Sequence, residues 1–290
     1  MSTMVAKQAS KADRSKGRIG RNISLIITYF IVVLFTALIG YPILWVVLQS
    51  FKTMPEMFMD AWAMPQNLLW ENYQRAIEIS NILVYARNSI FVSVTAVIFI
   101  LILSSTASYA FSKFNFAGRN ILFYIFVFSL MLPVPIIPLF SVIVNLGLMN
   151  SHWALIWIYT SGGLPFSIFM LKSFFDGIPK EIEEAAFIDG CPHYLIYARI
   201  IMPLAKPGLA TVVIFQFMGA WNEFFNALIF VRRSDMRTIP IGMQAFFIEF
   251  ASEWPALFAT LTMTIIPVLL VYAIMQKQFI EGLTAGATKL

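Results

Sequence analysis

The chain has 290 residues, of which 59% are hydrophobic and 12% are charged, and its formal net charge is +5. Soluble globular proteins carry about 25% charged residues, so this chain has too little charge to cover a water-exposed surface. A single cysteine excludes an internal disulfide. Composition therefore predicts an all-α polytopic membrane protein.

Apolar stretches long enough to cross a membrane occur six times. A spanning helix needs about 20 largely apolar residues, because the hydrocarbon core is about 30 Å thick. The stretch 120–171 is too long for one helix, and its polar segment 145–151 divides it into two. We therefore expect six spans, within 22–51, 88–112, 120–144, 152–171, 207–231 and 254–276.

Two of these spans carry unusual residues. The third contains Pro133, Pro135 and Pro138, each of which removes a helical N–H, so this helix is expected to be kinked or broken. The fifth contains Glu223, which we expect inside the helix. An ionisable group at such a position is costly and faces a cavity or a partner.

Basic residues indicate the orientation of the spans. Six spans place both termini on one side, and most of the 20 Lys and Arg residues lie in the tails and connections of that side. The positive-inside bias predicts that this side is cytoplasmic. Arg232 and Arg233 fall on the outer side and run against the bias. Basic residues at membrane edges, beside anionic lipid, explain the net charge without a nucleic-acid partner.

Chain organisation follows from these spans. Residues 1–21 form a basic cytoplasmic tail that is expected to be disordered, 22–280 form the transmembrane domain, and 281–290 form a second cytoplasmic tail. The longest polar cytoplasmic segment within the domain is 176–203.

The 176–203 segment has clear helix signals. Pro179 suits a helix start, acidic residues follow it, and Gly190 suits the helix end. Ile182, Ala185, Ala186 and Asp189 fall at helical spacing and predict a small apolar patch on one face. This helix is either a docking surface for another protein or an interfacial helix that lies on the membrane.

Pro192 is expected to open a second short helix after Gly190. Its apolar side chains are expected to face the edge of the bilayer; they are Leu195, Ile196, Ile200 and Ile201.

The same segment carries a longer pattern. It reads Glu184-Ala-Ala-x-x-x-Gly190, then Ile200-Ile-Met-Pro203, and resembles the EAA signature of bacterial ABC-importer permeases. The usual form ends Ile-x-Leu-Pro, so Met202 is the one departure. The segments Phe217-Met-Gly-Ala-Trp-Asn-Glu-Phe224 and Glu281-Gly-Leu-Thr-Ala-Gly286 also resemble the carbohydrate-uptake branch, in its MalG-like type.

This resemblance implies an architecture and a set of partners. The fold would be that of a type I ABC importer permease in the bacterial inner membrane. The chain would pair with a second permease subunit, two copies of a cytoplasmic ATPase and an external solute-binding protein, and would import a sugar or oligosaccharide. The helix within 176–203 would couple the ATPase to the membrane helices, through Glu184, Ala185, Ala186, Asp189 and Gly190.

The sequence lacks the motifs of catalysis. It has no Gly-x-x-x-x-Gly-Lys-Ser/Thr loop and no His-Glu-x-x-His helix, so we expect no cofactor or metal here, and ATP would be bound by the partner ATPase. His152, His193 and Cys191 are expected to be surface, buried or interface residues.

Polar residues of the fifth span are candidates for the translocation path. They are Gln216, Asn222, Glu223 and Asn226, of which only part can share one helix face. Two interpretations stay open: polar groups that bond solute hydroxyls, or a hydrogen bond between helices. The alternative functions are a self-sufficient ion-coupled carrier, which one buried Glu argues against, and an intramembrane enzyme, which would need more catalytic groups.

Overall fold

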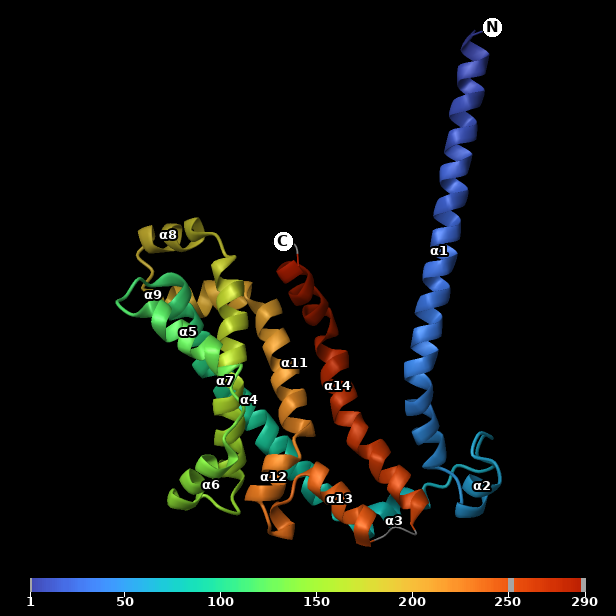
Figure 1. Cartoon of the computed structure of the whole chain (residues 1–290), viewed down its shortest axis with the longest axis vertical. Helices are drawn as coiled ribbons and strands as arrows, with labels where there is room; N and C mark the ends of the chain where they lie inside the picture. The colour runs from blue at the N-terminus through green and yellow to red at the C-terminus, as the bar shows by residue number, and fades with distance from the viewer. Residues whose placement is uncertain (1, 250–252, 288–290) are drawn as a thin grey trace.

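The computed structural model describes residues 2–249 and 253–287, and every regular element in those ranges is helical (Figure 1). Within these described ranges, four single helices contain a stretch that is apolar and long enough to cross a membrane. They are α1 (Ser2–Gln49), α4 (Ile82–Lys113), α7 (His152–Asp176) and α14 (Trp254–Ala287). The all-α membrane fold is therefore confirmed, with the first, second, fourth and sixth expected spans present.

The third expected span is broken at its prolines. α5 (Arg119–Ser129) and α6 (Ile136–Asn145) are separated by a connection that holds Pro133 and Pro135. Both helices are shorter than a membrane crossing requires. The break is confirmed, while the count of six spans stays a prediction.

The fifth expected span is bent at one end and interrupted at the other. α9 (His193–Ile196), the π-helical turn η1 (Tyr197–Ile201) and α10 (Met202–Leu204) lead through a 75° bend into α11 (Lys206–Asn222). Glu223 then has extended backbone (φ −71°, ψ 122°), and α12 (Phe225–Phe230) follows. The prediction of a continuous helix around Glu223 is therefore wrong.

The long helices form a bundle with two distinct ends. α8 (Lys180–Ile188) and α9 lie at one end, together with the C-terminal part of α14 (Figure 1). We call this the α8 end. The opposite end, the α13 end, holds the short helices α2 (Met54–Met59), α3 (Glu71–Ser80), η2 (Ser234–Met236) and α13 (Ile239–Glu249).

The centre of the bundle is the contact between α4, α7 and α11. Small residues allow these helices to approach closely. A Cβ added to Gly163 of α7 would lie 2.6 Å from Gln216 Oε1 and 2.7 Å from Ile100 Cδ1. The Ser108 hydroxyl of α4 donates to the Ile168 carbonyl of α7 at 3.0 Å. Close packing of α4, α7 and α11 therefore depends on small residues such as Gly163 as well as on contacts between side chains.

α1 stands apart from this bundle (Figure 1). Residues 25–44 are all exposed, and α1 approaches α14 only near its end, where Trp45 meets Phe258 edge-on at 5.4 Å. α1 begins at Ser2 and so includes residues 2–21; the expected disorder of this tail stays a prediction. This tail contains no proline, and its Ala, Lys and Arg residues are strong helix formers.

Candidate functional site

The helix expected within 176–203 is present as α8. Pro179 is its N-cap, and Glu181 and Glu183 occupy the first turn. Gly190 has φ +80°, a conformation that favours glycine. Gly190 N–H donates to Phe187 O and Cys191 N–H donates to Ala186 O, each at 3.0 Å. These two bonds form a Schellman motif, so the predicted helix end is confirmed.

The two alanines of α8 lie on different sides. Ala186 is buried against the bundle, in a cluster with Leu171 and Phe175 of α7. Ala185 is exposed, as are Ile182 and Asp189. The expected single patch of Ile182, Ala185, Ala186 and Asp189 is therefore wrong, because the helix turns Ala186 inward to fill the space above α7.

The exposed side of α8 is partly apolar. Phe187 and Ile188 have 60% and 84% of their surface exposed, beside Glu184 and Ala185. Large apolar side chains so exposed within a polar surface are typical of a protein–protein contact. Among the described residues, α8 thus presents an exposed, partly apolar face.

The segment after α8 is packed inward. Ile196 and Ile201 are 1% and 0% exposed and contact the same cluster as Leu171, Phe175 and Ala186. We expected these isoleucines to face the bilayer edge, which is wrong for both: they seat the segment on the bundle. The π-helical turn η1 follows Ile196 and ends at Ile201, and such turns are frequent at functional sites.

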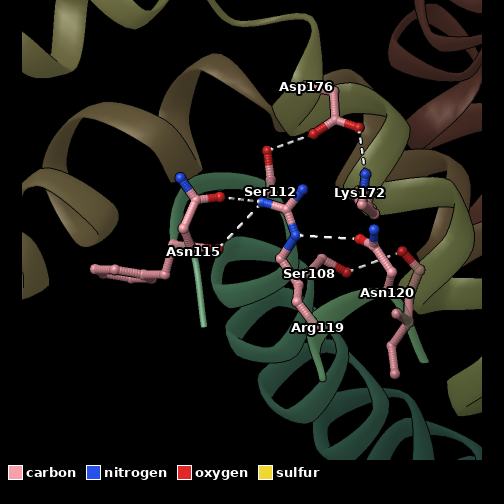
Figure 2. Close-up of polar contacts among 9 residues, drawn as sticks. Ser108, Ser112, Asn115, Arg119, Asn120, Lys172 and Asp176 are labelled. Carbon is pink, nitrogen blue, oxygen red and sulfur yellow. Dashed lines mark hydrogen bonds and ion pairs between the residues drawn. The ribbon is translucent and has the colours of Figure 1, made fainter. Parts of the chain in front are cut away.

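A polar network surrounds the α8 end of α4, α5 and α7. Figure 2 shows the Asp176 carboxylate between Ser112 and Lys172, with distances of 2.7 Å to the Ser112 hydroxyl and 2.6 Å to the Lys172 ammonium. Arg119 lies between Asn115 and Asn120, and its Nη1 donates to Asn115 Oδ1 at 2.9 Å. A cavity of about 800 Å³ is lined by residues of α8 and by Ser112, Asn115, Arg119, Lys172 and Asp176.

Sequence reasoning missed an ion pair in this region. Lys113 Nζ of α4 lies 2.5 Å from Glu183 Oε1 of α8, and also donates to Ile178 O at 3.2 Å. The only available signal was that Lys113 closes an apolar span and that Glu183 precedes the EAA-like pattern. Neither position alone indicates the other.

Glu223 is held by groups from two helices. Tyr159 Oη of α7 donates to its Oε2 at 2.7 Å, and Ala227 N–H donates to the same oxygen at 3.2 Å. Asn226 donates to Oε1 through its backbone N–H at 2.8 Å and its side-chain amide at 3.0 Å. The carboxylate thus accepts two backbone N–H groups in the first turn of α12, just after the chain leaves the helical conformation at Glu223. Tyr159 was not expected from the sequence.

The other candidates for the translocation path point in different directions. Gln216 Nε2 donates to Gly163 O at 3.2 Å and to Ser167 Oγ at 3.1 Å, both on α7. Asn222 is exposed, donates to Met218 O at 2.9 Å, and borders a cavity of about 350 Å³ beside Trp221 and Thr264. Gln216 thus contacts α7, whereas Asn222 bonds within α11. Its role in transport stays a prediction.

Metal binding finds no support in the part of the chain that the structure describes. No group of three or more His, Cys, Asp or Glu side chains lies close enough together there to hold an ion. His193 instead lies between Phe187 and Phe114, with ring centroids at 5.4 and 5.1 Å.

Comparison with known families decides the class of this protein. Residues 100–284 match the family described as binding-protein-dependent transport system inner membrane component. The chain belongs to this family. The match covers α8, the bend and α11, so the structural features above lie within the part that defines the family. The protein is thus a membrane-spanning transport subunit and the non-catalytic part of an importer.

Individual relatives agree with this assignment. The diacetylchitobiose uptake system permease protein NgcG of Streptomyces coelicolor is 34% identical over 97% of this chain and 92% of its own length. The inner membrane ABC transporter permease protein YcjP of Escherichia coli is 36% identical, over 93% of this chain and 98% of its own.

A solved structure also matches the fold. One chain of a bacterial ABC transporter that imports the acidic polysaccharide alginate has a TM-score of 0.80 and 26% identity, over 89% of this chain and 97% of its own. The fold of an ABC importer permease is therefore shown for this chain.

Proposed function

We propose that this chain forms half of the translocation path of an ATP-driven importer and receives the motion of a separate ATPase through α8. One observation carries the proposal: Ala186 anchors α8 to the bundle, while its other face is exposed, at Glu184, Ala185, Phe187 and Ile188. A groove on a partner protein could accept this face of α8, and the small side chain of Ala185 would allow the partner to approach the α8 backbone closely.

The proposed assembly has a second permease subunit, two copies of the ATPase and an external solute-binding protein. The α8 end would face the cytoplasm, as the excess of basic residues predicts. Closure of the ATPases would displace α8 and open the cavity of the permease pair outward. ATP hydrolysis would then reset the cavity inward, since coupling requires a contact whose energy differs between the two states.

The proposed solute is a carbohydrate. The relative NgcG is named for diacetylchitobiose, and the solved neighbour for alginate. On this chain, the cavity beside α11 combines the apolar Trp221 with the polar Asn222 and Thr264. Sugars bind through such mixed surfaces, because their hydroxyls need hydrogen bonds and their ring faces contact apolar groups.

The test is co-purification of a tagged chain from mild detergent, with the recovered proteins identified by mass spectrometry. We expect a second permease and an ATPase with the wild-type chain. Ala185→Glu should weaken the ATPase contact by about 2 kcal/mol, or roughly thirtyfold, as expected for a residue at the centre of an interface. Equal recovery of the ATPase with this variant would contradict the role of α8.

A matched control uses another exposed alanine. Ala63 lies on the connection between α2 and α3, at the α13 end. Ala63→Glu adds the same charge to an exposed site away from α8, so it should leave the recovery of the ATPase unchanged.

A further inference from the structure

An ion pair between Lys113 and Glu183 joins α8 to the membrane-spanning helix α4. Lys113 is the last residue of α4, and Glu183 lies in the first turn of α8. Their side chains are only 7% and 16% exposed, whereas the ion pairs Arg75–Glu253 and Arg233–Asp235 are far more open to water. Water and salt therefore screen Lys113–Glu183 less than these surface pairs.

The ammonium of Lys113 also fixes the chain that enters α8. It donates to the Ile178 carbonyl at 3.2 Å, one residue before the N-cap Pro179. One side chain of α4 therefore holds both the approach to α8 and its first turn. Loss of either charge would remove this ion pair and leave the other charged group, which is mostly buried, without its nearest partner.

A second link lies two helical turns back along α4. The hydroxyl groups of Ser105 and Tyr197 of η1 lie 2.7 Å apart, and the rings of Tyr109 and Tyr197 have centroids 5.2 Å apart. Ser105, Tyr109 and Lys113 are spaced by four residues, so they share one face of α4. The neighbouring face of α4 contacts α7 through two hydrogen bonds, from Ser108 to Ile168 and from Ser112 to Asp176.

We propose that Lys113 and Glu183 are positioning residues that make α8 and α4 move together, so that displacement of α8 reaches the α13 end of the bundle. The inference rests on the proposed role of α8 in coupling. It assigns a transmission role to two residues outside the EAA-like pattern of Glu184–Gly190. The link is also direct, because α4 runs the length of the bundle and contacts both α7 and α11 (Figure 1).

The experiment follows the far end of α4 in the intact transporter. Leu83 lies in the first turn of α4 and is 59% exposed. A Leu83→Cys reporter in a Cys191→Ser chain is purified with its partner proteins, reconstituted in nanodiscs, and labelled with a maleimide with and without ATP and vanadate. The measured quantity is the change in labelling rate that ATP and vanadate cause.

The prediction concerns variants that reverse one or both charges. Lys113→Glu or Glu183→Lys alone should reduce the ATP-dependent change in labelling rate by about fivefold or more, since fivefold is the lower end of typical coupling between sites. The double variant Lys113→Glu/Glu183→Lys restores opposite charges and should restore the change. Should the reversals fail to assemble, Lys113→Gln and Glu183→Gln remove one charge each with little change in size, and should give the same loss.

The control is Lys172→Glu. Lys172 lines the same cavity, but its ion pair with Asp176 lies within α7 and does not join α8 to α4. This variant should keep the ATP-dependent change.

Three outcomes overturn the proposal: full response in the single variants, equal loss in Lys172→Glu, or no response in the wild-type reporter. In the last case, recovery of an ATPase with the chain would still support the proposed function, so the two failures are distinguishable.

Discussion

Glycine at position 190 is favoured by the backbone conformation and not by a lack of space for a side chain. Its φ is +80°, and a Cβ added there would meet no atom within 4 Å. Any other residue at this position has enough space, but the left-handed backbone conformation destabilises it by about 1–2 kcal/mol. The sequence predicted this residue well, because the end of a helix is a local property.

The first prediction compares two substitutions of Gly190. Gly190→Val should lower recovery of the ATPase with the tagged chain, because the Schellman motif that ends α8 is strained. Gly190→Asn should be close to wild type, since Asn tolerates the left-handed region. Quantitative mass spectrometry of the purified complex checks both. Equal loss in the two variants would show that the site responds to bulk and not to backbone conformation.

Contacts between residues far apart in the sequence could not be predicted. Glu223 was expected inside a helix because apolar residues flank it on both sides. Its partner Tyr159 lies on α7, and nothing in either segment points to the other. The same holds for Lys113 and Glu183. Local rules give the helix ends, whereas contacts between helices depend on packing that the sequence does not display.

At the scale of elements, α7 and α11 are held together by a close approach. Gln216 of α11 bonds Gly163 O and Ser167 Oγ of α7, and Gly163 leaves room for this side chain. Gln216 therefore connects two helices near their middles, which is the structural alternative to a role in the path. The apolar spans were predictable from hydropathy, but this register between them was not.

Two neighbouring glycines test this contact. Gly163→Ala would place its Cβ 2.6 Å from Gln216 Oε1, so the Gln216 side chain must shift and weaken its hydrogen bonds to α7. We expect the free energy of unfolding to fall by about 1 kcal/mol. Gly162→Ala is the matched control, because nothing lies within 4 Å of its added Cβ. Thermal unfolding of the purified chain in detergent should show a lower Tm for Gly163→Ala only. A similar Tm for both variants would mean that Gln216 adjusts to the added methyl group without loss of stability.

On the scale of the whole molecule, the chain is incomplete by itself. Residues 25–44 of α1 are all exposed, and so are Phe187 and Ile188 of α8. Apolar surface of this extent must be covered by lipid or by other subunits. The sequence predicted a membrane protein with partners. It could not separate the surfaces that meet lipid from those that meet protein, because both are apolar.

Orientation gives the last prediction, and the chain carries its own reporter. Cys191 is the single cysteine and lies partly exposed directly after Gly190, at the end of α8. A cytoplasmic α8 end predicts that a membrane-impermeant maleimide labels Cys191 in inverted membrane vesicles and not in right-side-out vesicles. Stripping of peripheral subunits before labelling keeps the thiol accessible. The control is Ala63→Cys in a Cys191→Ser chain, which places the thiol at the α13 end and should reverse the pattern. Labelling of Cys191 from outside would invert the topology, and α8 could then not meet a cytoplasmic ATPase.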